Sequence, residues 1–219
     1  SIQKLISLSF IFILISCGEP SHPTLDTFEV EKDVFESGKS LISLPFDLHD
    51  LEEVTVDQNI LLIGVHGSNS RGYEWIYPLQ RLNNDGNMVS FFRWDDNGCP
   101  NPSLNTLLTL IKQKFYDNPN LNKVILLGHS YGGLLAVAFA EAWDMDVPLQ
   151  IHSIAAPLKG MGIINSICDY KLPDNLKNNI ELHQWRTIKE LDGAFSDLDY
   201  DPQVMKILKS KVTRLPETY

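Results

Sequence analysis

Five runs of apolar residues recur along the chain from position 59 onward, and stretches with helical spacing separate them. Continuous apolar character over four to eight residues is typical of strands buried on both faces. The pattern therefore predicts strands at 59–65, 88–94, 124–127, 149–154 and 180–187. Apolar positions spaced by three and four predict helices at 74–82, 104–116 and 132–143, with Ser103 capping the second.

The order of these elements alternates strand and helix, which is the pattern of a parallel sheet with helices on both faces. The segment 160–178 interrupts the alternation as a surface insertion, and 211–216 resembles a last strand. Short strands are also expected near 28–31 and 41–44. In such α/β proteins ligands bind at the carboxyl ends of the strands. The loops after Val65, Trp94 and Leu127 all fall at that edge.

Composition narrows the possible partners. The 219 residues carry a formal charge of −10, and nucleic-acid binding needs a basic face. A nucleic-acid partner is therefore not expected. A chain of this length is long enough for one domain with a sizeable core.

The N-terminus has the features of an export signal. Lys4 precedes the apolar stretch 5–16, which is too short to span a bilayer and fits the apolar region of a signal peptide. The following Cys17 and Gly18 make the site resemble a bacterial lipobox. That resemblance implies that Cys17 is lipidated and that the protein is anchored at the outer membrane. We expect a signal peptide at 1–16 and a polar linker at 17–40.

Cysteine usage agrees with export but does not fix a pairing. If Cys17 carries lipid, Cys99 and Cys168 remain, and an oxidising periplasm would let them pair. They are also consistent with two unrelated thiols, because the sequence gives no distance between them.

One segment presents a single serine. Gly128-His129-Ser130-Tyr131-Gly132 lies between a predicted strand and a predicted helix, which is the context of a nucleophile elbow. Glycine is needed at 128 and 132 because the turn is tight, and the serine hydroxyl is exposed at the sheet edge.

On these residues, together with His66-Gly67 and Ala156-Pro157-Leu158-Lys159-Gly160, the chain resembles the α/β-hydrolase family over about residues 58–192. The resemblance is with its small lipase-like esterases. It implies an α/β-hydrolase domain over 41–219, with Ser130 as nucleophile. It also implies an oxyanion hole made by the Tyr131 N–H and the Gly67-Ser68 region. No metal or organic cofactor is implied.

In the family an acid follows the strand after the insertion, and a histidine base follows the acid. Asp192 is the best candidate acid, with Asp197, Asp199 and Asp201 as competitors. No histidine lies between Leu191 and Tyr219. The chain also starts with serine rather than methionine. We therefore expect a domain that is incomplete at its C-terminal end, with the base beyond Tyr219.

The sequence thus predicts a lipid-anchored serine hydrolase that cleaves small-molecule or lipid carboxylic esters through an acyl-enzyme on Ser130. Two alternatives stay open. The same fold and site could act on thioester or amide bonds. The missing histidine is also consistent with a non-catalytic binding lipoprotein. The oligomeric state is not predicted.

Overall fold

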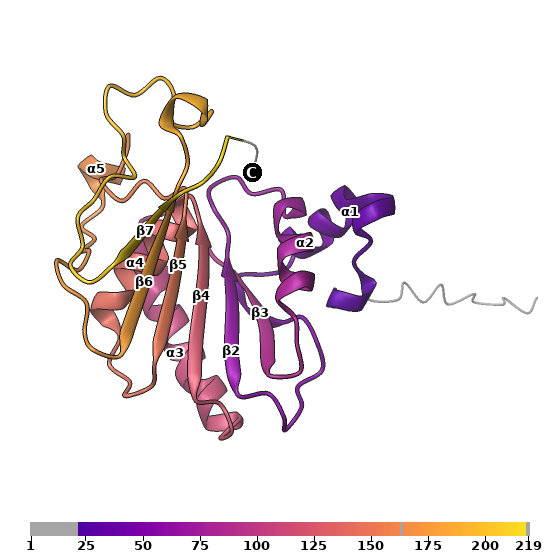
Figure 1. The fold of residues 1–219 in the computed structure, drawn as a ribbon. Helices are drawn as coiled ribbons and strands as arrows, with labels where there is room; N and C mark the ends of the chain where they lie inside the picture. The colour runs from indigo at the N-terminus through magenta and orange to yellow at the C-terminus, as the bar shows by residue number, and fades with distance from the viewer. Residues whose placement is uncertain (1–21, 163, 218–219) are drawn as a thin grey trace, which may run out of the picture.

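The computed structural model describes residues 22–162 and 164–217, and within them seven strands form one sheet in the order β1-β3-β2-β4-β5-β6-β7 (Figure 1). The predicted signal peptide at 1–16 and Cys17 lie outside the described residues. The strands are β1 (Asp47–Asp50), β2 (Ile60–Val65), β3 (Asn87–Arg93), β4 (Lys123–His129), β5 (Leu149–Ile154), β6 (Ile180–Arg186) and β7 (Lys211–Arg214).

The helices are α1 (Val30–Ile42), α2 (Tyr73–Leu82), α3 (Pro100–Asp117), α4 (Tyr131–Ala142) and α5 (Ile164–Ile167). Two 3₁₀ turns, η1 (Leu25–Thr27) and η2 (Lys189–Leu191), complete the regular structure. Within residues 22–162 and 164–217, no helix is long and apolar enough to cross a bilayer.

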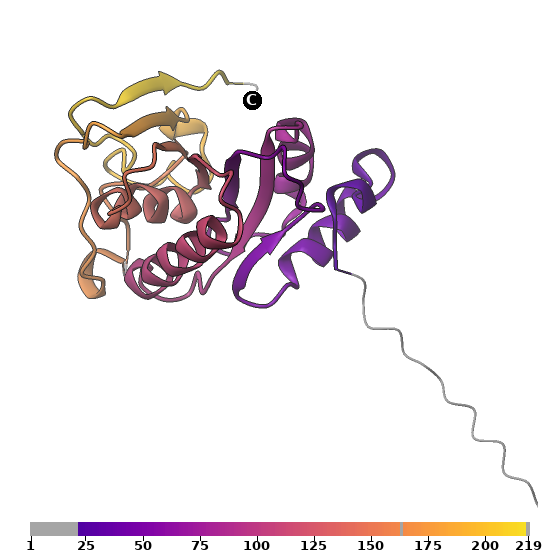
Figure 2. The same ribbon diagram turned by 90° about the horizontal axis from the view of Figure 1, so that it is seen from below.

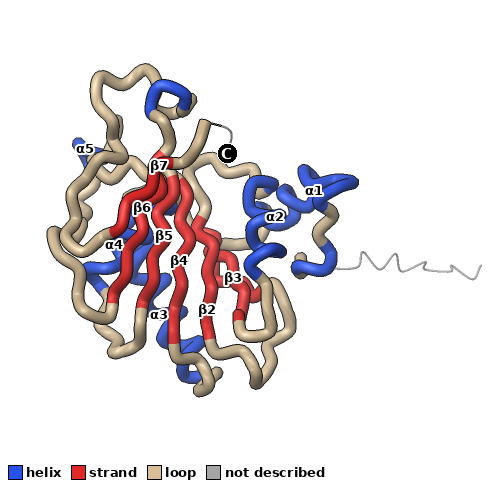
Figure 3. The backbone as a smooth tube through the Cα atoms, in the orientation of Figure 1, coloured by secondary structure: helices blue, strands red, loops and turns tan. Residues whose placement is uncertain are grey.

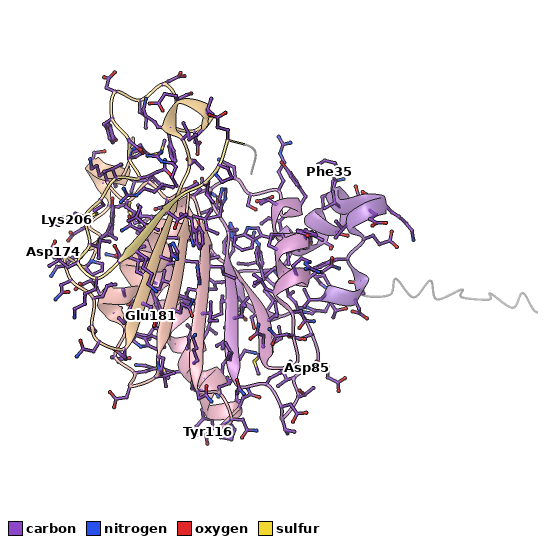
Figure 4. All side chains as sticks on the ribbon, viewed as in Figure 1. Phe35, Asp85, Tyr116, Asp174, Glu181 and Lys206 are labelled. Carbon is purple, nitrogen blue, oxygen red and sulfur yellow. A yellow bond between two sulfur atoms is a disulfide. The ribbon has the colours of Figure 1, made fainter. Side chains whose placement is uncertain are left out.

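The predicted parallel sheet is confirmed. Every neighbouring pair of strands from β3 to β7 is parallel, and only β1 runs antiparallel, against β3 at one edge (Figure 3). The carboxyl ends of the central strands therefore meet at one edge of the sheet. Asp85, before β3, and Tyr116, near the end of α3, lie at the opposite edge (Figure 4).

The sheet separates two hydrophobic cores, because alternate residues of a strand point to opposite faces. In β2, Leu61 and Ile63 face the core built by α3 and α4, whereas Leu62 faces the core built by α1 and α2. Figure 2 shows these two helix layers on either side of the sheet. On the α2 side of the sheet, the helices cover β2 and β3, whereas His152 of β5 and Trp185 of β6 are only half-buried.

The five central strands and three long helices match the sequence prediction within a few residues, and 211–214 is a strand as expected. The Ser103 cap was wrong: α3 begins at Pro100, after Cys99 in an extended conformation (φ −75°, ψ 153°). Proline suits the first helical position because its ring fixes a helical φ and its missing N–H is not needed there. The predicted insertion contains α5 as its only described regular element.

The strands expected near 28–31 and 41–44 were also wrong, because α1 occupies most of this region. Leu25, Phe28 and Leu41 are buried in the core on the α2 side. Part of the segment expected to be a linker is therefore folded onto the domain. Two glycines permit the contact: a Cβ on Gly38 would lie 2.4 Å from the Tyr73 nitrogen, and one on Gly72 would lie 2.2 Å from the Gly38 carbonyl oxygen.

Gly38→Ala tests this contact. In an unpacked helix alanine would stabilise by about 1 kcal/mol, but here the methyl group meets backbone that must shift. We expect a loss of about 1–3 kcal/mol in the free energy of unfolding, measured by urea denaturation. Ser40→Ala, at an exposed position of α1, is the control and should stay near wild type. A Gly38→Ala protein as stable as wild type would contradict the packing of α1 on α2.

Candidate active site

Ser130 lies between β4 and α4 in a strained conformation, with φ 52° and ψ −121°. A positive φ is costly for a residue with a side chain and persists only where its surroundings hold it. Here the Ser130 N–H donates to the Ile154 carbonyl oxygen (2.8 Å), and its carbonyl oxygen accepts from Gly133 (2.9 Å). The end of β5 and the start of α4 thus hold the serine in this turn.

Two glycines make the turn possible. A Cβ on Gly128 would lie 2.4 Å from the Gly132 carbonyl oxygen, and a Cβ on Gly132 would lie 2.2 Å from the Val65 carbonyl oxygen. These atoms are backbone and cannot move aside. The start of α4 consequently packs directly against the end of β2, with Ser130 at the carboxyl edge of the sheet.

Groups able to bind an oxyanion lie beside the serine. The N–H of Tyr131 belongs to the first turn of α4, where backbone donors lack a partner within the helix. Gly67 comes so near that a Cβ on it would lie 3.0 Å from the Ser130 Cβ. Ser68 and Ser130 line the same cavity. The three predicted oxyanion residues are therefore brought together around Ser130.

His66 is a neutral side chain that orients this loop. Burial lowers its pKa from its ordinary value to about 4. Its Nδ1 lies 2.9 Å from the Gly67 carbonyl oxygen and its Nε2 lies 2.5 Å from Nη1 of Arg93. Because the guanidinium only donates, Nε2 accepts and Nδ1–H donates to Gly67. In a trans peptide C=O and N–H point in opposite directions, so this bond turns the Ser68 N–H away from the His66 ring.

A second contact fixes the same loop. The N–H of Asn69, which has a φ of 53°, donates to a carboxylate oxygen of Asp96 (2.7 Å). The Tyr131 ring packs on Trp94, and its hydroxyl donates to the Gly98 carbonyl oxygen (2.7 Å). Burial raises the pKa of this hydroxyl to about 12, so it stays a neutral donor. The loops after β2, β3 and β4 are thereby joined at one edge.

Asp192 follows β6 and η2, and both of its carboxylate oxygens are held. One accepts from the Thr187 hydroxyl (2.7 Å) and the other from the Ala194 N–H (3.0 Å). Ala194 lines the same cavity as Ser130. Burial lowers the pKa of His129, which precedes the serine, and the negative charges of Glu74 and Asp192 partly oppose this shift. Asp192 is therefore a fixed carboxylate close to the elbow.

The competing acids have other surroundings. The carboxylate of Asp201 accepts from the N–H and side-chain amide of Gln203. Asp197 accepts from the hydroxyl of Ser196 beside it at 3.4 Å. Asp199 is exposed. As far as the described residues define the cavity that contains Ser130, neither these three acids nor Asp192 lines it, and Asp192 is distinguished by its hydrogen bond to the N–H of Ala194, which does.

The cavity at Ser130 has a volume of about 730 Å³. The predicted insertion provides Met161, Ile164 and Ile167 to its wall, and Cys99 and Cys168 also line it. These two cysteines form a disulfide, which settles the pairing that the sequence left open. In the described part of the chain, histidine, cysteine and carboxylate side chains do not gather in groups of three that could hold a metal ion.

Four of the histidines have partners away from Ser130. His152 accepts from the Trp185 indole (3.0 Å), and His183 lies 2.7 Å from the Thr213 hydroxyl, both on the half-buried face of the sheet. His22 and His49 lie near the N-terminal segment, with ring centroids 5.6 Å apart. Within residues 22–162 and 164–217, no histidine forms a hydrogen bond with Ser130 or Asp192.

The chain after β7 leads back toward Asp192. β7 runs parallel to β6, so it also ends at the carboxyl edge. The N–H of Leu215 donates to the Arg186 carbonyl oxygen (2.7 Å), and the Arg214 guanidinium donates to that of Thr187 (2.6 Å). The backbone thus leaves β7 beside the residue whose hydroxyl holds Asp192.

Sequence reasoning missed several positioning residues. Arg93, Asp96 and Thr187 each fix a group at the site, but each is an ordinary polar residue at or just after a strand end. Arg93 contacts His66, and Asp96 contacts Asn69; in both pairs the two residues are 27 positions apart in the sequence. A polar residue at the carboxyl end of a parallel strand is a usable signal for such contacts.

Comparisons with known proteins agree with this geometry. No family model matches the chain. A proline iminopeptidase from Saccharolobus solfataricus is 35% identical over 174 residues, which cover 71% of this chain and 51% of that protein. The chain thus spans about half the length of the curated relative that it matches.

Two solved structures share the fold. A marine microorganism esterase has a TM-score of 0.51 at 18% identity, covering 80% of this chain and 92% of that one. Est1E from Butyrivibrio proteoclasticus has a TM-score of 0.52 at 12% identity, covering 77% and 82%. With its mostly parallel sheet and the elbow after β4, the chain has the α/β-hydrolase fold.

The buried His66 makes stability depend on pH. Its pKa is near 4 in the folded protein and near 6.5 when unfolded, so the unfolded chain binds more protons between these values. Stability should fall as pH drops from about 6.5 to about 4. The contribution of His66 to this loss is about 3 kcal/mol. The variant His66→Asn, whose amide can still donate to Gly67, tests this contribution by urea unfolding at pH 7 and pH 4. Between these pH values its free energy of unfolding should fall by about 3 kcal/mol less than that of the wild type. Equal losses in the two proteins would contradict a neutral His66.

Proposed function

We propose that this protein is a serine hydrolase that cleaves carboxylic esters through an acyl-enzyme on Ser130. The observation that carries the proposal is the strained turn at Ser130 (φ 52°), held at the carboxyl edge of the sheet beside a cavity. Strain of about 1–3 kcal/mol at such a residue is typical of active sites, where it presents a reactive group.

The mechanism follows from the surrounding groups. The Ser130 hydroxyl attacks the carbonyl carbon, and the oxyanion that forms accepts hydrogen bonds from the N–H groups of Tyr131 and the Gly67-Ser68 region. The base proposed below accepts the Ser130 proton and passes it to the leaving oxygen, which departs as the alcohol. The same base then takes a proton from a water molecule, which attacks the acyl-enzyme and releases the acid while Ser130 regains its proton. The positive N-terminal end of α4 points at this site and stabilises the developing negative charge.

Asp192 is the proposed acid of the triad. Its fixed carboxylate would hold the base in the useful tautomer and stabilise its charged form. The proposed base is a histidine downstream of Tyr219. The course of the backbone after β7 supports this, because it leads back to Thr187 and so to Asp192.

An amide or peptide bond is the second candidate, favoured by the 35% identity to a proline iminopeptidase. The elbow and oxyanion groups would serve either bond. Comparing proline p-nitroanilide with p-nitrophenyl butyrate separates the candidates, since each substrate releases a coloured product. A protein that hydrolyses neither and is not labelled by a fluorophosphonate would instead be a binding protein.

We further propose that the protein is exported and anchored to a bacterial membrane through Cys17, most simply the outer membrane. The lipobox-like Leu14-Ile15-Ser16-Cys17 supports this. The Cys99–Cys168 disulfide is a second support, because such bonds persist in oxidising compartments.

Ser130→Ala tests the nucleophile. In protein expressed from the whole reading frame, hydrolysis of p-nitrophenyl butyrate should fall about 10³-fold or more while the unfolding midpoint changes little. Ser103→Ala, at the start of α3, is the control and should keep wild-type turnover. Turnover by Ser130→Ala at the wild-type rate would contradict the mechanism.

Asp192→Asn tests the acid in the same assay. Its rate of hydrolysis should fall about 10³-fold or more, whereas the rate of Asp197→Asn, in the same loop, should not fall.

Cys17→Ser tests the anchor. Without the thiol there is no atom to carry the lipid, so the protein should move from the membrane pellet to the soluble fraction of lysed bacterial cells. Immunoblotting of the two fractions measures the shift. A variant that stays with the membranes in the wild-type proportion would count against the anchor.

A further inference from the structure

The cavity beside Ser130 has one apolar wall, formed by described residues of 161–162 and 164–168. Met161, Ile164 and Ile167 belong to this wall, and Pro157 and Ala194 extend the apolar lining. Ile164 also packs against the main hydrophobic core, so it ties the wall to the body of the domain. Of the described residues that line the cavity, Asp96 alone carries a charge.

A short helix such as α5 does not keep its conformation alone, because nucleating a helix is unfavourable. The disulfide joins Cys168, just after α5, to Cys99, which caps the long helix α3. The Asn101 side chain also donates to the Asp169 carbonyl oxygen. These contacts fasten the C-terminal end of the wall to α3.

The N-terminal end of the wall is held separately. The Tyr200 hydroxyl donates to the Gly160 carbonyl oxygen (3.0 Å), and the Lys159 N–H donates to that of Pro202 (2.8 Å). In Figure 1, α5 lies at the carboxyl edge of the sheet, where the strands present the site. The wall is therefore fixed at both ends above the nucleophile.

We propose that this disulfide-fastened wall binds a neutral apolar group of the substrate, next to the scissile carbonyl, and selects substrates by the length of that group. This inference rests on the proposed function for the position of the carbonyl at Ser130. A carboxylate on the substrate would meet the negative charge of Asp96, and no lysine or arginine is among the described residues that line the cavity, so anionic groups should bind more weakly than neutral ones.

The test measures binding without turnover. Ser130→Ala protein is titrated with p-nitrophenyl acetate, butyrate, hexanoate and octanoate, and quenching of tryptophan fluorescence gives each Kd. Burial of each added methylene should tighten binding by about fourfold until the cavity is full. Methyl, propyl and pentyl esters of 4-nitrobenzoic acid form the second series. The series that shows the length dependence identifies whether the acyl or the alcohol side lies against the wall.

Variants test whether the dependence of binding on chain length arises at this wall. Ile167 is 67% exposed, so Ile167→Trp should fold, narrow the cavity and remove the advantage of the longer chains. Val56→Trp is the matched control, since Val56 is 79% exposed and its carbonyl oxygen accepts from Asn120, ahead of β4 at the opposite edge. The double variant Cys99→Ser/Cys168→Ser should flatten the length dependence. Mono-p-nitrophenyl succinate should bind at least tenfold more weakly than the butyrate.

The outcomes separate the two proposals. Length-dependent binding that Ile167→Trp removes and Val56→Trp keeps supports the inference. A Kd that does not change with length in either series overturns it, as does an Ile167→Trp protein with the profile of Val56→Trp. These results do not depend on catalysis. Failure of the proposed function would instead appear as wild-type protein that binds the esters but neither hydrolyses them nor reacts with a fluorophosphonate.

Discussion

The site depends on the close contact between the start of α4 and the end of β2. Gly132 lies so near the Val65 and His66 carbonyl oxygens that a Cβ would be 2.2 and 2.3 Å from them. This contact forces the sharp turn at Ser130 and brings the loop after β2 beside it. The strained serine, the neighbouring backbone donors and the direction of α4 all follow from one backbone approach that only glycine allows.

Around this contact, fixed hydrogen bonds set the direction of each polar group. His66 stays neutral because it is buried, and so it can donate to Gly67 while accepting from Arg93. Asp192 is held at both oxygens by Thr187 and Ala194. These groups need little reorganisation during a reaction, which is how preorganised sites stabilise charge that develops in a transition state.

Local patterns predicted the central sheet and the elbow, because buried strands and a glycine-bounded turn leave their marks in adjacent residues. Where the decisive contact is distant, the prediction failed or stayed open. The sequence predicts a linker and short strands where α1 forms, because α1 is stabilised by packing on α2 through Gly38 and Gly72, a contact that its own polar sequence does not indicate. The Cys99–Cys168 pairing joins residues 69 positions apart, and the role of Arg93 depends on His66 in another strand. Asp192 was favoured for its place in the chain, but Thr187, which fixes it, was not singled out.

The central claim is that Ser130 forms a covalent acyl intermediate. The most direct measurement is to mix the full-length protein with p-nitrophenyl butyrate, quench it in acid during turnover, digest it and map the added mass by mass spectrometry. We predict a butyryl group on Ser130 in the peptide that spans the elbow. Hydrolysis with no acyl group on that peptide, or with the group on another residue, would contradict it.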